Sequence, residues 1–300
     1  MTLVLLLSPE EIKKDSKRMN HILDKLLAKV YDASISSDHR ADGELHISEL
    51  LITFVKLSND DHTLNYIMEQ SPVDLHTPTK TVFFINQLIY HYCEIKNDDS
   101  LKQATCTALV NILWSLSFQN KYQQQLKNAG TKFKEIIIRL TKTIDANVSP
   151  NQYVPKYIED IQKAAAGLLF NIDELTSSAI ESVSENSQKP MVMISYSHQN
   201  VEFCKQLYNE ILKKNYDVWI DFQFLKTGDL WEQIAVGMKR ANVIVCLMSE
   251  DYCKSKSCRW EATYALDKLQ SNKSIIPVLL QKYPLPDWLG KFSEKDSSSS

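Results

Sequence analysis

The chain has 300 residues, 44% of them apolar and only six of them glycine, which indicates a helix-rich globular protein with two domains that each have a core. The net charge is −3 and neither half is basic, so the electrostatic footprint of a nucleic-acid-binding protein is missing. No stretch approaches the roughly 20 apolar residues that a membrane span needs.

The six cysteines do not have the spacing of a zinc site, and Cys106 and Cys246 lie inside apolar runs that are typical of a core. We therefore expect a cytoplasmic protein with reduced thiols and no metal site.

Residues 1–175 are expected to be helical throughout. Residues 8–11 carry a start signal, with a capping serine and a proline at the first helical position. A second start signal at 98–100 precedes a helix over 101–116. Further helices are expected over about 122–129, ended by Gly130, and over about 132–144, whereas 38–44 is expected to be a loop.

A weak internal echo occurs in this region at an offset of 60 residues. Residues 104–112 and 164–172 both have small residues, then an apolar pair, then Asn and Ile, the Asn being Asn111 and Asn171. This pattern predicts helices that pack closely, with an asparagine that bridges a loop. Residues 80–175 resemble armadillo-type repeats, and an irregular helical bundle remains equally open.

The polar run 176–189 is expected to be a linker, and the serine-rich end 292–300 a disordered tail. The expected domains are therefore a helical domain at 1–175 and a second domain at 190–291.

Residues 190–290 alternate apolar strands with amphipathic helices, which predicts a parallel α/β sheet covered on both faces. The strands are expected at 192–194, 218–220, 243–248 and 275–280. Because the chain becomes polar after Lys291, the last strand is expected at an edge, where Pro277 is tolerated. Since chemistry in such sheets occurs at the carboxyl ends of the strands, we expect it at 195–198, 221–228 and 249–261.

Four blocks of this region carry a family resemblance: "VMISYSHQN", "VWIDFQFLKTGD", "VIVCLMSEDYCKSKSCRWEATYAL" and "SIIPVLLQ". In this order they resemble a TIR domain, which implies a flavodoxin-like, doubly wound parallel sheet. The ending "PDWLG" resembles the form common in invertebrate animals. Helices ahead of a TIR domain are further similar to the axon-degeneration NAD hydrolases, although the sterile-alpha-motif domains of that family are missing. The resemblance covers about a third of the chain, and the domain is shorter than usual after its fourth strand.

The resemblance implies cleavage of NAD+ at the nicotinamide–ribose bond, with NAD+ as substrate and no required cofactor. Glu261 matches the carboxylate that stabilises the ribosyl cation in enzymatic members. A purely structural alternative is that Glu261 lies in the first turn of a helix and interacts favourably with its dipole.

The resemblance also implies contacts with the nucleotide, and the candidates come from four segments. They are Tyr196, Ser197, His198, Asp221, Gly228, Leu230 and Trp260. The family's basic residue in the second loop is replaced by Phe224, and Ser257 stands where enzymatic members often have tryptophan.

Two functions from different classes follow. The first is a signalling NAD+ nucleosidase regulated by the helical region. The second is a non-catalytic adaptor that associates with other TIR domains through the loop 222–229, which contains the apolar residues Phe222, Phe224 and Leu225.

Overall fold

The computed structural model describes residues 16–57, 61–70, 80–93, 99–142, 158–172, 190–220, 230–268, 274–283 and 289. The chain divides into two compact units, Met1–Ile172 and Asp173–Ser300. The expected helix start at 8–11, the linker 176–189, the loop 221–229 and the tail 292–300 lie outside the described residues. No helix in the described ranges is both long and apolar enough to cross a membrane.

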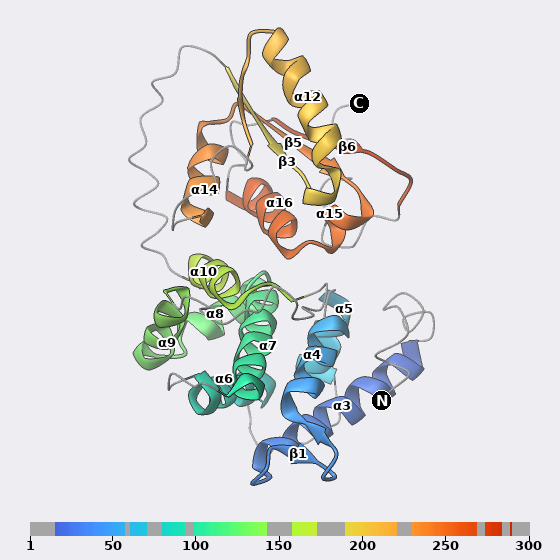
Figure 1. Cartoon of the computed structure of the whole chain (residues 1–300), viewed down its shortest axis with the longest axis vertical. Coiled ribbons are helices and arrows are strands. Elements are labelled where there is room, and N and C mark those ends of the chain that lie inside the picture. The colour runs from blue at the N-terminus through green and yellow to red at the C-terminus, as the bar shows by residue number, and fades with distance from the viewer. Residues whose placement is uncertain are drawn as a thin grey trace. The chain divides into compact units, whose positions relative to one another are not determined.

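The N-terminal unit is mostly helical (Figure 1). Its helices are α3 (Ser16–Ile35), α4 (Ile47–Leu57), α5 (Asp61–Asn65), the π-helical turn η1 (Tyr66–Gln70), α6 (Lys80–Cys93), α7 (Ser100–Leu116), α8 (Asn120–Lys127), α9 (Thr131–Thr141) and α10 (Ile161–Ile172). The predictions for α7, α8 and α9 are confirmed to within a few residues. Gly130 was expected to end α8, but the C-cap of α8 is Asn128. Gly130, with φ of 98°, is instead the N-cap of α9.

Helix α7 is the centre of this unit. It begins where the sequence predicted, because the Asp99 side chain accepts a hydrogen bond from the Leu101 backbone amide at 2.9 Å. From Thr105 onward nearly every residue is buried, since α4, α6 and α10 all pack against it. A helix that is surrounded in this way is apolar on all sides.

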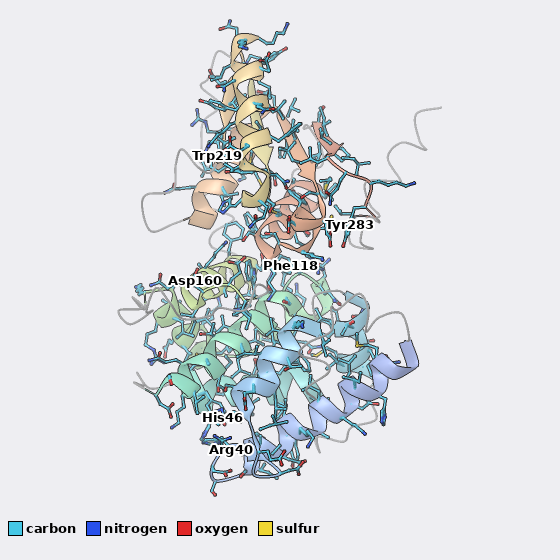
Figure 2. The ribbon with its side chains drawn as sticks, turned by 45° about the vertical axis from the view of Figure 1, so that its right-hand side comes forward. Arg40, His46, Phe118, Asp160, Trp219 and Tyr283 are labelled. Carbon is cyan, nitrogen blue, oxygen red and sulfur yellow. A yellow bond between two sulfur atoms is a disulfide. The ribbon has the colours of Figure 1, made fainter. Side chains whose placement is uncertain are left out.

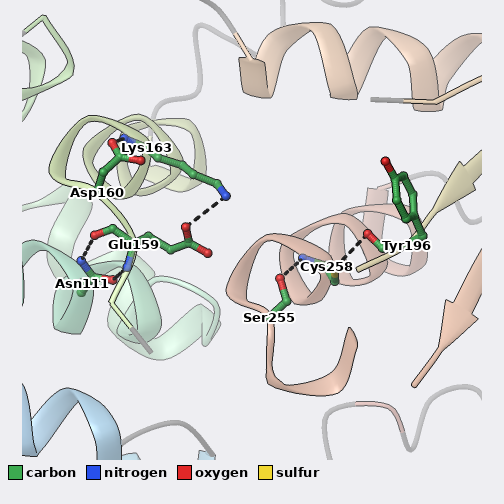
Figure 3. A network of polar contacts seen from close by, with 7 residues as sticks. All are labelled: Asn111, Glu159, Asp160, Lys163, Tyr196, Ser255 and Cys258. Carbon is green, nitrogen blue, oxygen red and sulfur yellow. Dashed lines mark hydrogen bonds and ion pairs between the residues drawn. The ribbon is translucent and has the colours of Figure 1, made fainter. Parts of the chain in front are cut away.

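The echo at 104–112 and 164–172 falls on α7 and α10, which pack against each other. The bridging asparagine is confirmed at Asn111 (Figure 3). Its Nδ2 donates to the Glu159 carbonyl at 2.9 Å, and its Oδ1 accepts from the Glu159 amide at 3.1 Å. Gly167 allows the close approach, because a Cβ there would lie 2.5 Å from the Trp114 ring. Whether these helices form armadillo-type repeats stays a prediction.

Two details of the N-terminal unit differ from expectation. The loop expected at 38–44 includes most of a small hairpin, β1 (Arg40–Ala41) and β2 (Leu45–His46), which Figure 2 shows with Arg40 and His46 labelled. Asp42 and Gly43 both have positive φ, as tight hairpin turns require. The expectation of reduced thiols throughout is wrong for one pair, because a disulfide joins Cys93 and Cys106 across the α6–α7 connection. Their Cα atoms lie 5.5 Å apart, a proximity that sequence spacing does not reveal.

The C-terminal unit contains a four-stranded parallel sheet in the order β4-β3-β5-β6. The strands are β3 (Met191–Ser195), β4 (Asp217–Trp219), β5 (Val243–Met248) and β6 (Ser274–Leu279). This is the flavodoxin-like order that the sequence predicted. Within the described residues β6 lies at an edge, where Pro277 is tolerated.

Helices cover both faces of the sheet. Helix α12 (Val201–Lys213) packs on one face, where Cys204 meets Ile194, Tyr196 and Val245 in a core cluster. Leu212, one residue before the end of this helix, is 42% exposed. Helices α14 (Leu230–Arg240) and α16 (Lys256–Lys268) both contact β3 and each other on the other face. Short helices η2 (His198–Asn200) and α15 (Glu250–Lys254) follow β3 and β5.

Candidate active site

The candidate site lies at the carboxyl ends of β3 and β5, the two central strands. The chain passes from β3 to β4 on one side and reaches β5 on the other, so the strand order reverses between β3 and β5. This topological switch point is where doubly wound sheets bind their ligands. The segments that follow these two strands supply the side chains described below.

Glu261 lies in α16 and faces the end of β3. The helix begins at Lys256, so Glu261 occupies its second turn, and only 8% of the residue is exposed. Placement of Glu261 in the first turn of the helix is therefore wrong, and the structural alternative of a glutamate beside the helix dipole loses its basis. Glu261 is a buried carboxylate, and a buried carboxylate needs hydrogen-bond partners.

One of these partners is Ser195, the last residue of β3. Ser195 Oγ donates to Glu261 Oε2 at 2.5 Å and lies 2.7 Å from the Tyr252 hydroxyl, which comes from α15. Ser195 is 1% exposed and Tyr252 is fully buried. Three elements that are distant in the sequence thus bring two hydroxyls and one carboxylate into a single hydrogen-bonded chain.

Further hydrogen bonds fix the segments that carry these groups. Ser249 caps α15 by accepting from the Tyr252 amide at 3.1 Å, and its hydroxyl donates to Asn200 Oδ1 at 2.6 Å, which ties α15 to η2. Cys258 Sγ donates to the Tyr196 carbonyl at 3.4 Å, which ties α16 to the chain just beyond β3 (Figure 3). These hydrogen bonds therefore fix both α15 and α16 against the chain that follows β3.

The thiols around the site are not activated. Burial raises the pKa of Cys246 to about 12, an effect that the hydrogen bond from Tyr252 opposes and the neighbouring Glu261 charge strengthens. Burial also raises the pKa of Cys253 to about 11. At neutral pH both remain protonated, so neither is a nucleophile.

The Tyr252 hydroxyl likewise keeps its proton. Burial is the main reason that its pKa is well above the ordinary value, followed by the neighbouring thiols and the Glu261 carboxylate. A tyrosine in this state is a hydrogen-bond donor.

The other candidate residues that the structure describes do not join the hydrogen-bonded group around Glu261. Because side chains alternate along a strand, Ser195 faces Glu261 while the Tyr196 side chain joins the core cluster under α12. Ser197 is 7% exposed, whereas His198 is exposed at the start of η2, with its ring 5.9 Å from that of Tyr196. Trp260 is buried and stacks on Tyr264 at 5.2 Å.

Three candidates remain without a described side chain. Asp221 and Gly228 lie outside the described residues, and Leu230 begins α14. Among the described residues there is no group of three or more His, Cys, Asp or Glu that could hold a metal ion.

Sequence reasoning placed Ser195 and Tyr252 inside the expected segments 195–198 and 249–261 but did not single them out as site residues. A signal for Ser195 was present, because it is a polar residue between apolar neighbours in a strand covered on both faces. Such a residue requires a polar partner from a covering helix. Nothing in the local sequence names that partner.

Comparison with known proteins is consistent with this geometry. The family model for the TIR domain matches residues 192–298. The chain is also 30% identical over 219 residues to the probable 2′ cyclic ADP-D-ribose synthase TcpO of Methanobrevibacter olleyae, an alignment that covers 64% of this chain. The aligned part of this chain is longer than the TIR domain, so the similarity extends into the N-terminal unit.

The alignment spans 63% of the length of that relative. No solved structure matches the chain significantly. The parallel sheet, its strand order and the family match agree, and the C-terminal part of this chain is therefore a TIR domain.

Proposed function

We propose that this TIR domain cleaves NAD+ at the bond between nicotinamide and ribose, with Glu261 as the catalytic carboxylate. The observation that carries the proposal is the position of Glu261: a buried carboxylate, bonded to the end of β3, at the point where the strand order reverses. The similarity to a protein named as a cyclic ADP-ribose synthase supports a substrate that contains ADP-ribose.

Cleavage of the nicotinamide–ribose bond can be catalysed by one fixed negative charge near the ribosyl carbon. When the carbon–nitrogen bond breaks, its electron pair leaves with nicotinamide, which becomes neutral, and the ribosyl carbon develops an oxocarbenium charge. A carboxylate held near that carbon stabilises the charge most strongly where water is excluded. Water then adds to the carbon and releases a proton, which gives ADP-ribose. If a hydroxyl of the same molecule adds instead, the product is a cyclic ADP-ribose.

The test is incubation of the purified full chain with NAD+, followed by chromatography of nicotinamide, ADP-ribose and cyclic products. Glu261→Gln should lower kcat by about 100-fold or more, because the charge is lost while an oxygen remains to accept from Ser195. The matched control is Glu202→Gln on α12, whose side chain is 79% exposed and which should retain wild-type activity. Wild-type turnover in Glu261→Gln would remove Glu261 from the mechanism.

Absence of nicotinamide release from the wild-type chain would overturn the enzymatic proposal and favour the adaptor alternative. The adaptor would act through association with other TIR domains, for which the loop 222–229 is the expected surface. Phe224→Asp should then shift the protein toward monomer in sedimentation analysis, whereas unchanged sedimentation would exclude this loop.

We further propose that the helical unit restrains the activity of the TIR domain. Residues 190–300, once shown by circular dichroism to be folded, should release nicotinamide faster than the full chain. An equal or slower rate would mean that the helical unit is a scaffold or an activator.

A further inference from the structure

The direction of the hydrogen-bonded chain Tyr252–Ser195–Glu261 depends on the charge of Glu261. A serine hydroxyl carries one proton, and Ser195 uses it to donate to Glu261 Oε2. Either hydroxyl could donate in the 2.7 Å contact between Ser195 and Tyr252, but once Ser195 donates to Glu261 this contact must draw on the Tyr252 hydroxyl, which also lies beside Cys246. When Glu261 is ionised, the proton order is therefore Tyr252 to Ser195 to Glu261.

Burial makes this chain strong. Ser195 and Tyr252 are 1% and 0% exposed, so water does not compete for their hydroxyls. Hydrogen bonds in series polarise one another, and a donor to an ionised acceptor is roughly twice as strong as a neutral pair. Tyr252 remains protonated and keeps donating, because burial raises its pKa well above the ordinary value.

We propose that Ser195 and Tyr252 are positioning residues that keep the Glu261 carboxylate ionised and hold it in the orientation that faces the substrate. This inference rests on the proposed function, since it concerns the same carboxylate. Ser195 bonds to Glu261 directly, and Tyr252 acts through Ser195.

A merely structural role for the same contacts is the competing explanation. Ser195, Tyr252 and Glu261 belong to β3, α15 and α16, so their bonds also tie these elements together. A structural tie would change stability alone. A positioning role changes the pH dependence of the reaction and its kcat in molecules that are fully folded.

The experiment measures kcat, KM and the pH–rate profile of the full chain for wild type, Ser195→Ala, Tyr252→Phe and the double variant. Ser195→Ala should lower kcat about 10- to 100-fold with little change in KM, and the acidic limb of the profile should shift to higher pH. Tyr252→Phe should act in the same direction but less. Tyr208→Phe on α12 removes a hydroxyl elsewhere in the domain and serves as the matched control.

The double variant separates the two explanations. If Tyr252 acts through Ser195, its replacement in the Ser195→Ala background should cause no further loss of kcat. Additive losses of kcat, or a stability change with unchanged kcat and pH profile, would overturn the proposal.

A second measurement keeps the inference distinct from the proposed function. The ¹³C resonance of the Glu261 carboxyl, assigned by its loss in Glu261→Gln, can be titrated with pH whether or not the chain cleaves NAD+. Its titration midpoint should lie at higher pH in Ser195→Ala than in wild type. An unchanged midpoint would overturn the role of Ser195, while a shifted midpoint in a chain without activity would overturn the proposed function alone. Should Ser195→Ala fail to fold, Tyr252→Phe must show the same shift in smaller degree, and no shift would refute the chain.

Discussion

Replacing Asn111 by alanine tests how much the N-terminal unit depends on a side chain that bridges two of its elements. Asn111 is completely buried in α7. Its Nδ2 donates to the carbonyls of Thr107 at 3.0 Å and Glu159 at 2.9 Å, and its Oδ1 accepts from the Glu159 amide at 3.1 Å. The two bonds to Glu159 fix the segment that leads into α10 (Figure 3).

The magnitude follows from what the truncation leaves behind. Each neutral hydrogen bond contributes about 1 kcal/mol net, and a polar group left without a partner costs up to about 1–3 kcal/mol when it is fully buried. Glu159 is only partly buried, so we expect Asn111→Ala to lower the free energy of unfolding by about 3 kcal/mol. For a unit of this size that corresponds to a fall in melting temperature of roughly 6–12 °C.

The assay is denaturant unfolding of the full chain followed by far-UV circular dichroism. Asn120→Ala, at the exposed start of α8, is the matched control and should change stability by no more than about 0.5 kcal/mol. Asn111→Asp should be at least as destabilising as alanine, because it turns a charge toward two carbonyl oxygens. Equal stability of Asn111→Ala and Asn120→Ala would refute the reasoning that the bonds to Glu159 hold α7 and α10 together.

Two further outcomes concern packing and pH. Gly167→Ala should destabilise the N-terminal unit by about 1–3 kcal/mol, since the new Cβ would lie 2.5 Å from the buried Trp114 ring, and an unchanged unfolding midpoint would mean that this ring can move aside. Burial, followed by positive neighbours, holds the pKa of His39 and His46 below the ordinary 6.5 in the folded state, so the unfolded chain binds protons first as the pH falls. The stabilisation by these two neutral histidines should be complete above about pH 6.5 and decline below it. Between about pH 7.5 and pH 5.5, the free energy of unfolding of a double His39→Gln, His46→Gln variant should therefore fall less than that of wild type. Equal losses of stability would contradict this assignment.

The local patterns of the sequence determined the elements and much of the architecture. The apolar run of β5 was predicted with the bounds that the structure has, because a strand covered on both faces leaves a continuous signal. The start of α7 was readable from Asp99, since a cap depends on residues within one turn. Alternating strands and helices allowed few topologies, which is why the parallel sheet could be predicted. Its strand order was predicted through the resemblance to TIR domains.

The carboxylate was also readable, but its environment was not. The sequence singled out Glu261 through its motif and its place after β5. It placed that residue in a helix's first turn, because Ser255, whose hydroxyl accepts from the Cys258 amide at 3.3 Å, was not recognised as the residue that caps α16. Burial of Glu261 depends on β3, which lies 66 residues earlier.

Contacts between distant segments were decided by the tertiary structure alone. The bonds from Ser195 to Tyr252 and Glu261 span 57 and 66 residues, and the Cys93–Cys106 disulfide depends on how α6 and α7 approach. Periodicities of 2.0 and 3.6 residues tell which face of an element is buried. They do not tell which residue of another element meets that face, because this depends on how all the layers pack at once.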